Sequence, residues 1–106
     1  MAFVYILKCA DNSYYTGSTT NFELRMAQHQ SGYFKGYTSV RLPVTLVWWA
    51  ELPNEHEAFL RERQIKGWSR AKKEALIQED WDRIHVIVKQ ERERRRMKKA
   101  APETDH

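Results

Sequence analysis

The first thirty residues place the strongest constraint on the fold. Residues 3–9 and 13–18 are short runs rich in β-branched and aromatic residues, and a turn-forming Asp-Asn pair lies between them. This pattern predicts a β-hairpin. Because side chains alternate along a strand, Tyr5 is expected to share one face of the first strand with Phe3 and Leu7.

A helix is predicted directly after the hairpin. Thr20, followed three residues later by Glu23, is a typical N-cap signature, and Gly32 is expected to end the helix near residue 31. Arg25 and His29 are four residues apart, so a helix places them on the same face. The segment therefore predicts a guanidinium and an imidazole side by side, close to the hairpin.

The remaining chain predicts one more strand and further helices. Residues 44–50 (VTLVWWA) are nearly all apolar, which favours a strand at the centre of a sheet. Cap-like residues open helices at residues 54–57 and at Ser69, and residues 81–99 predict a last helix. The order β-β-α-β-α-α, with this additional C-terminal helix, indicates an α+β domain with a small three-stranded antiparallel sheet flanked by helices.

Length and composition suit one compact domain. The chain has 106 residues, 42% of them hydrophobic, which is near the modal size of a globular domain. We expect a main domain over residues 1–80, a helical extension with a basic tail over residues 81–99, and a disordered terminus over residues 100–106. Cys9 is the only cysteine, so it is expected to be a buried thiol rather than half of a disulfide.

The net charge of +4 is concentrated near the C-terminus. Residues 89–99 carry seven Lys or Arg and two Glu, residues 100–106 carry −2, and residues 1–88 are left with +1. The basic run, which includes Arg94, Arg95 and Arg96, can attract a polyanion such as nucleic acid, although a solvated helix end is an equally good interpretation.

The sequence offers no membrane or secretion signal. No run approaches the ~20 apolar residues that a membrane span needs, and the N-terminal residues lack the basic-then-apolar layout of a signal peptide. The expected location is therefore the cytoplasm.

The chemistry-bearing residues resemble those of a known family. The sequence resembles a GIY-YIG nuclease domain, and more closely the short single-domain bacterial branch of that superfamily, over about residues 3–78. Two tripeptides, an Arg-x-x-x-His pair and a later glutamate carry the likeness, in the same order along the chain. They are Val4-Tyr5-Ile6, Tyr15-Thr16-Gly17, Arg25 with His29, and Glu62. Val4 and Thr16 depart from the family signature, but both suit a strand.

The resemblance implies metal-dependent hydrolysis of phosphodiester bonds. Glu62 would bind one Mg²⁺ or Mn²⁺ through its carboxylate, and Arg25 would bind phosphate oxygens in a bidentate manner. Either Tyr5 or Tyr15 would take the proton from water, with the balance favouring Tyr15, and His29 would relay that proton or orient a phenol. Since a phenol has a pKa of about 10, nearby cations must assist it.

Other residues are candidates for metal or nucleic-acid contacts. Glu57 and, less so, Glu55 are rival metal ligands in the helix that contains Glu62. The aromatic, basic loop over residues 32–43 and the tail supply candidates for phosphate or base contacts. The predicted nucleic-acid-binding residues are Gly17, Lys35, Tyr37, Arg41, Arg94, Arg95 and Arg96.

Two classes of function follow from this pattern. The first is an endonuclease or exonuclease of low sequence specificity that acts on single-stranded, duplex or branched DNA, with a role in repair implied by the resemblance. The second is a non-catalytic nucleic-acid-binding module, or an interaction protein that depends on a protein partner. Each residue taken singly has an ordinary structural explanation, whereas their occurrence together favours the enzyme.

Overall fold

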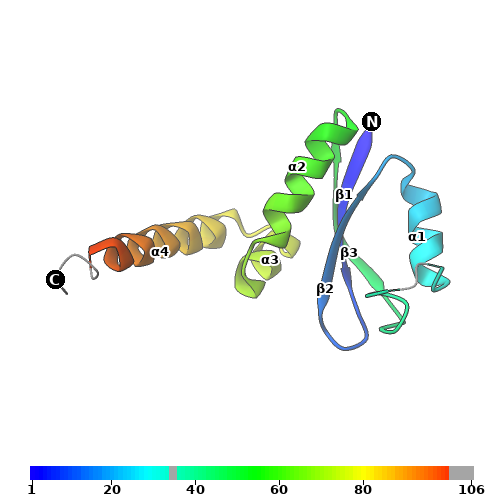
Figure 1. Ribbon diagram of the computed structural model, residues 1–106, viewed down its shortest axis with the longest axis horizontal. Coiled ribbons are helices and arrows are strands. Elements are labelled where there is room, and N and C mark those ends of the chain that lie inside the picture. The colour runs from blue at the N-terminus through cyan, green and yellow to red at the C-terminus, as the bar shows by residue number, and fades with distance from the viewer. Residues whose placement is uncertain (34–35, 101–106) are drawn as a thin grey trace. The chain divides into compact units, whose positions relative to one another are not determined.

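The computed structural model describes residues 1–33 and 36–100, with side chains described through residue 97. These residues form two compact units, Met1–Trp68 and a second that begins at Ser69. The first unit has three strands and two helices, and the second has two helices; Figure 1 labels all of them. The elements are β1 (Ala2–Lys8), β2 (Tyr14–Thr19), α1 (Phe22–Gln30), β3 (Thr45–Leu52), α2 (Glu55–Lys66), α3 (Arg70–Ile77) and α4 (Trp81–Ala100). The predicted α+β class with a three-stranded antiparallel sheet is confirmed.

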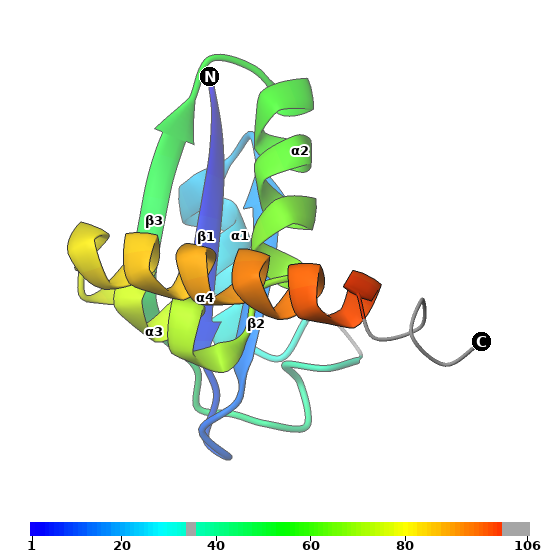
Figure 2. The ribbon, with the colours of Figure 1, turned by 90° about the vertical axis from the view of Figure 1, so that its left-hand side faces the viewer.

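The first strand, not the third, is the centre of the sheet. Figure 2 shows β1 between β2 and β3, and both pairings are antiparallel. The prediction that residues 44–50 form the central strand is therefore wrong. Four consecutive residues of β1, from Val4 to Leu7, have no solvent exposure, as expected for a strand covered on both faces. By contrast, Trp49 of β3 is 52% exposed, because an edge strand leaves part of its apolar surface at the rim.

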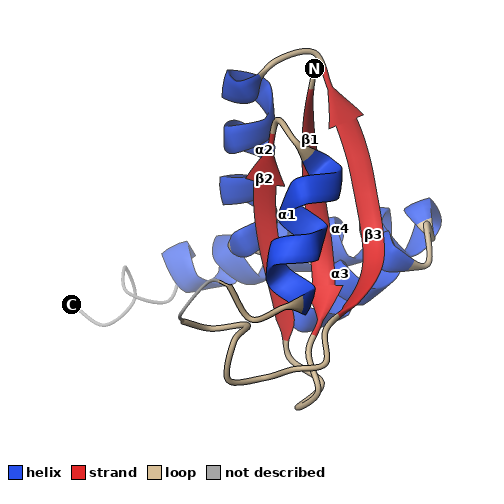
Figure 3. Cartoon of the chain, turned by 90° about the vertical axis from the view of Figure 1, so that its right-hand side faces the viewer, coloured by secondary structure: helices blue, strands red, loops and turns tan. Residues whose placement is uncertain are grey.

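The two helices of the first unit cover opposite faces of its sheet (Figure 3). On the α1 face, Phe22 and Met26 pack against a core cluster formed by Tyr5, Leu7, Cys9 and Val44. The alternate residues Val4 and Ile6 are buried on the other face, against which α2 packs. Tyr5 thus shares a face with α1, the helix that carries Arg25 and His29.

Side-chain caps fix the starts of the helices. The side chain of Asn21, not the predicted Thr20, caps α1, and its Oδ1 accepts a hydrogen bond from the Leu24 amide at 3.2 Å. Asn54 caps α2 and Ser69 caps α3, as predicted. Because a cap sets the first residue of a helix, these caps also set which side chains face the sheet.

The second unit consists of α3 and α4, which pack against each other. The ammonium of Lys72, a buried lysine on α3, lies 3.9 Å from the Glu91 carboxylate of α4. None of the described helices has the length and apolar character needed to cross a membrane. The predicted division after residue 80 stays a proposal. The predicted disordered terminus lies, from residue 101 onward, outside the described residues.

Candidate active site

A buried tyrosine lies at the centre of the predicted site. The Tyr5 hydroxyl is 2.8 Å from Nε2 of His29, which is also buried. Directly across the β1–β2 pair stands Gly17. A Cβ at position 17 would lie 2.6 Å from Cζ of Tyr5, and nearer still to its hydroxyl oxygen, so a side chain there would displace the phenol. The glycine of the second tripeptide therefore creates the space in which Tyr5 meets His29.

A hydroxyl holds the other side of the imidazole. Nδ1 of His29 is 3.1 Å from Oγ1 of Thr38, a buried residue in the loop between α1 and β3. The Tyr5 oxygen also accepts a hydrogen bond from Arg25. We assign the Tyr5 hydroxyl as the donor to Nε2, and this assignment places the His29 proton on Nδ1, from which it is donated to Thr38. These contacts connect the Arg25 guanidinium, the Tyr5 phenol, the His29 imidazole and the Thr38 hydroxyl in one chain of hydrogen bonds.

Burial keeps both central groups neutral at neutral pH. It raises the pKa of the Tyr5 phenol well above 10.0; Tyr15 and, more weakly, Glu62 add to this rise, and Arg25 opposes it. It also lowers the pKa of His29 below 6.5, and the nearby Arg25 charge lowers it further. The same effects show that Tyr15, Arg25 and Glu62 lie within electrostatic reach of Tyr5, and that Arg25 lies within electrostatic reach of His29.

The lowered pKa of His29 predicts acid sensitivity of the fold. Below pH 6.5 the unfolded chain binds a proton at this residue that the native protein does not. The contribution of His29 to the free energy of unfolding should therefore be fully present above pH 6.5 and be lost as the pH falls below 6.5 through the lowered pKa of the folded protein. Thermal melts across this range should show the loss, and His29→Gln should flatten the profile there. An equally steep profile in the variant would show that other groups cause the dependence.

Tyr15 connects the site to the loop before β3. Its ring centroid lies 5.2 Å from that of His29 and 6.1 Å from that of Tyr37, with the two phenol rings stacked. The Arg41 guanidinium lies 3.9 Å over the Tyr37 ring and forms an ion pair at 3.0 Å with Asp11. Two of the predicted nucleic-acid-binding residues, Tyr37 and Arg41, thus order the loop beside the site.

The predicted metal ligand lies on α2 and is held by two neighbours. Oε1 of Glu62 accepts a 2.6 Å hydrogen bond from the Ser18 hydroxyl, and Oε2 lies 2.8 Å from Nζ of Lys66. Its side chain is only 14% exposed. A sheltered carboxylate suits a hard divalent ion, which prefers oxygen ligands. The described residues contain no cluster of three or more His, Cys, Asp or Glu able to hold a metal.

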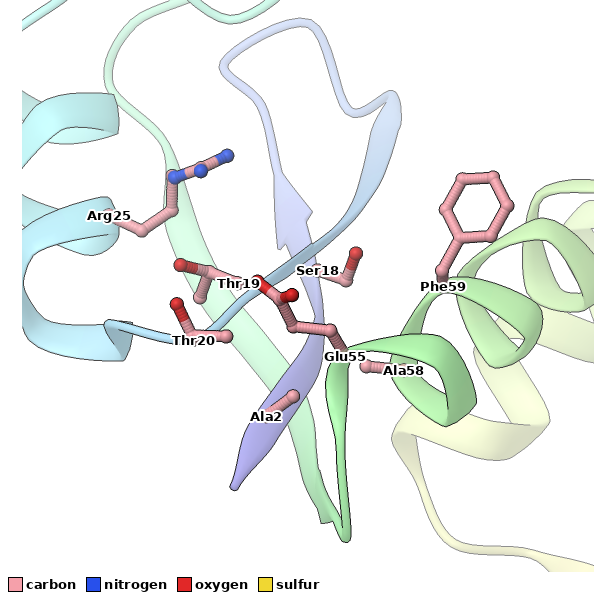
Figure 4. A pocket seen from close by; sticks show the side chains of 8 residues that line it. All are labelled: Ala2, Ser18, Thr19, Thr20, Arg25, Glu55, Ala58 and Phe59. Atoms are coloured by element: carbon pink, nitrogen blue, oxygen red, sulfur yellow. The ribbon is translucent and has the colours of Figure 1, made fainter.

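A cavity of about 250 Å³ opens between β2, α1 and α2 (Figure 4). Ser18 and Arg25 belong to its wall, which joins the cavity to the site. Glu55, one of the rival ligands, also lines it, but lies two helical turns, or roughly 10 Å, from Glu62 along the axis of α2. Glu57 is exposed. The lining residues are Ala2, Ser18, Thr19, Thr20, Arg25, Glu55, Ala58 and Phe59.

The structure therefore brings together Tyr5, Tyr15, Arg25, His29 and Glu62. Lys35 lies outside the described residues. Residues 94–96, the three predicted arginines of the tail, are exposed on α4 in the second unit. Their contacts with nucleic acid stay a prediction.

Sequence reasoning missed three residues that touch the site. Ser18 directly follows the second tripeptide, and Lys66 lies four residues after Glu62 on the same helix, so the i,i+4 rule could have found the lysine. Thr38 lies in an irregular loop, where no periodicity indicates which side chain turns inward.

Comparisons with known proteins identify relatives of this chain. A family model described as the GIY-YIG catalytic domain matches residues 1–75. A UPF0213 protein of Staphylococcus haemolyticus is 48% identical over 77 residues, which cover 73% of this chain and 94% of that protein. One from Natronomonas pharaonis is 46% identical over 78 residues, covering 74% and 92%. The solution NMR structure of a UPF0213 protein from Bacillus halodurans matches with 43% identity and a TM-score of 0.49, covering 74% of this chain and 84% of that one.

Proposed function

The chain belongs to the GIY-YIG family, and on this premise we propose that it is a nuclease that hydrolyses DNA phosphodiester bonds with one divalent metal ion. One observation carries the proposal. The Tyr5 phenol lies 2.8 Å from a neutral His29 and within electrostatic reach of both Arg25 and Glu62. The Tyr5 phenol would thus have a proton acceptor, a phosphate ligand and a metal ligand within its reach.

Glu62 and Arg25 would manage the charge of the phosphate. A divalent ion, Mg²⁺ or Mn²⁺, bound at the Glu62 carboxylate would supply charge stabilisation at the phosphate and leaving oxygens. Arg25 extends from α1 into the wall of the cavity and offers a planar fork of donors for two phosphate oxygens. It also stabilises any negative charge that develops on Tyr5, since it already acts to lower the pKa of that phenol.

Tyr5 is the phenol that we assign as the general base. With its pKa raised, it stays protonated in the resting protein and cannot act as a preformed phenolate. It can take a proton from water while it passes its own proton to Nε2 of His29 at 2.8 Å. Tyr15, the phenol favoured on sequence grounds, packs beside His29 and is half-buried. We assign it to positioning the imidazole.

The proposed substrate is DNA, which the protein would cut with low sequence specificity. Arg25 recognises phosphate, which every nucleotide carries, and phosphate contacts position a nucleic acid without reading its sequence. The exposed ring of Phe59 on the cavity wall offers a surface on which a base can stack. The basic residues of α4, with Lys35 and the Tyr37–Arg41 loop, would add sequence-independent attraction to the backbone.

A nucleic-acid-binding module without catalysis is the second candidate. It is favoured by one observation, that both oxygens of the Glu62 carboxylate already have partners in Ser18 and Lys66. Such a module would grip phosphate at Arg25 and leave the bond intact. The two candidates differ in whether a divalent ion leads to cleavage.

Cleavage by two tyrosine variants tests the proposal. Labelled single-stranded, duplex and branched DNA would be incubated with the wild type, Tyr5→Phe and Tyr15→Phe in Mg²⁺ or Mn²⁺. We expect metal-dependent cutting by the wild type, a loss of about 100-fold for Tyr5→Phe, the lower end of what general bases contribute, and a smaller loss for Tyr15→Phe. A larger loss for Tyr15→Phe would reverse the two roles. DNA binding with no cutting by the wild type would favour the binding module.

A further inference from the structure

The lysine beside Glu62 has no role in the reaction described so far. Lys66 lies one helical turn after Glu62 on α2, and its Nζ is 2.8 Å from Oε2. The lysine side chain is 50% exposed, whereas the glutamate side chain is 14% exposed. The carboxylate is therefore sheltered, and its cationic partner is the more exposed member of the pair.

Ser18 and Lys66, the two partners of the Glu62 carboxylate, differ in their effect on a divalent metal ion that approaches it. The Ser18 hydroxyl is neutral and donates to Oε1, so it orients the carboxylate without cancelling its charge. The Lys66 ammonium neutralises the carboxylate and would repel a divalent ion that approaches the same oxygens. Because a half-exposed lysine has a flexible four-carbon stem, it can leave at small cost.

We propose that Lys66 occupies the cation position at Glu62 in the resting protein and competes there with the divalent metal ion. The inference rests on the proposed function, since it takes Glu62 as the metal ligand. It has one further consequence. When the ammonium is displaced, a bound DNA phosphate offers it a new counter-ion, so DNA and metal strengthen each other's binding. By linkage, this coupling must be equal in both directions.

Metal affinity measured without DNA tests the competition directly. The loss of the free Mn²⁺ signal in electron paramagnetic resonance would give the Kd of the full chain and of Lys66→Met. Removing the ammonium should lower the Kd for Mn²⁺ about three- to fivefold. This change corresponds to the upper range of the energy of a partly exposed ion pair. Adding DNA should tighten Mn²⁺ binding less in Lys66→Met than in the wild type.

Matched variants separate the local effect from other causes. Arg61→Met removes the same charge from the same helix, where its guanidinium bonds Gln64 rather than Glu62, and should change the Kd less than Lys66→Met. Glu62→Gln should abolish Mn²⁺ binding, whether it is introduced into the wild type or into Lys66→Met. Lys66→Gln repeats the test should the methionine variant fold poorly.

Two results would overturn the competition. One is an equal or higher Kd in both Lys66 variants, which would make the ammonium a support of the site. The other is the absence of Mn²⁺ binding in the wild type and both variants. Cleavage is scored separately, so a wild type that binds Mn²⁺ but does not cut DNA would contradict the proposed function and leave the competition standing.

Discussion

Replacing Glu62 with glutamine is expected to lower metal-dependent DNA cleavage about a thousandfold or more, because a neutral amide cannot replace the carboxylate as a metal ligand. Glutamine keeps the length of the side chain and an oxygen that can accept the hydrogen bond from Ser18, so the fold should persist. DNA binding should change little, since Arg25 and the basic residues of the chain remain. Single-turnover cleavage and fluorescence anisotropy with the same labelled duplex would measure the two effects.

The same helix supplies the controls for this variant. Glu57→Gln changes an exposed carboxylate and should retain near-wild-type cleavage. Glu55→Gln changes a carboxylate that lines the cavity two turns away and should have an intermediate effect at most. Cleavage by Glu62→Gln at the wild-type rate would remove this carboxylate from the mechanism, and a total loss in Glu57→Gln would transfer its role to the rival ligand.

Gly17→Ala, which adds a single methyl group, is expected to lower the stability of the protein strongly. The added Cβ would lie 2.6 Å from Cζ and 3.0 Å from Cε2 of Tyr5, a residue with no room to retreat because it is fully buried. Overpacking of this kind costs about 1–3 kcal/mol, which in a chain of this size lowers the Tm by roughly 5–20 °C. Differential scanning calorimetry would measure the shift, and cleavage should fall because the phenol must leave His29.

Gly67 provides the matched control, because a Cβ there makes only ordinary van der Waals contacts. Its backbone has φ −80°, which any residue adopts, and a Cβ would lie 3.5 Å from the nearest atom, the carbonyl oxygen of Gln64. Gly67→Ala should therefore be neutral or stabilising. In a Tyr5→Leu background, Gly17→Ala should cost less than in the wild type, since the clashing ring is gone. Equal costs in the two backgrounds would show that the strain lies elsewhere.

Local patterns in the sequence were sufficient for most of the elements that hold the site. The hairpin, the pairing of Arg25 with His29 on one helix face, and the caps at Asn54 and Ser69 all follow from short-range rules and were confirmed. The centre of the sheet was misplaced because apolar content reports burial but not strand order. A run that is apolar on both faces can be central, or it can be an edge strand with an exposed rim, as β3 is.

The contacts that complete the site depend on tertiary structure and could not be read from spacing. The hydroxyl of Ser18 meets Glu62 only because α2 crosses the face of the sheet beside β2. Thr38 reaches His29 through a loop whose path is set by packing of Tyr37 on Tyr15. The resemblance to a family supplied the principal residues, but the residues that orient them became visible only in three dimensions.

The sequence distances spanned by these contacts also bear on how the protein folds. The Tyr5–His29 bond closes a loop of 24 residues, whereas the Ser18–Glu62 bond closes one of 44. Longer loops cost more chain entropy to close, and non-local contacts slow folding. We therefore expect the phenol–imidazole pair to assemble more readily than the Ser18–Glu62 contact, which needs α2 docked. On this order, a chain emerging from the ribosome would acquire the proposed proton relay before the proposed metal ligand.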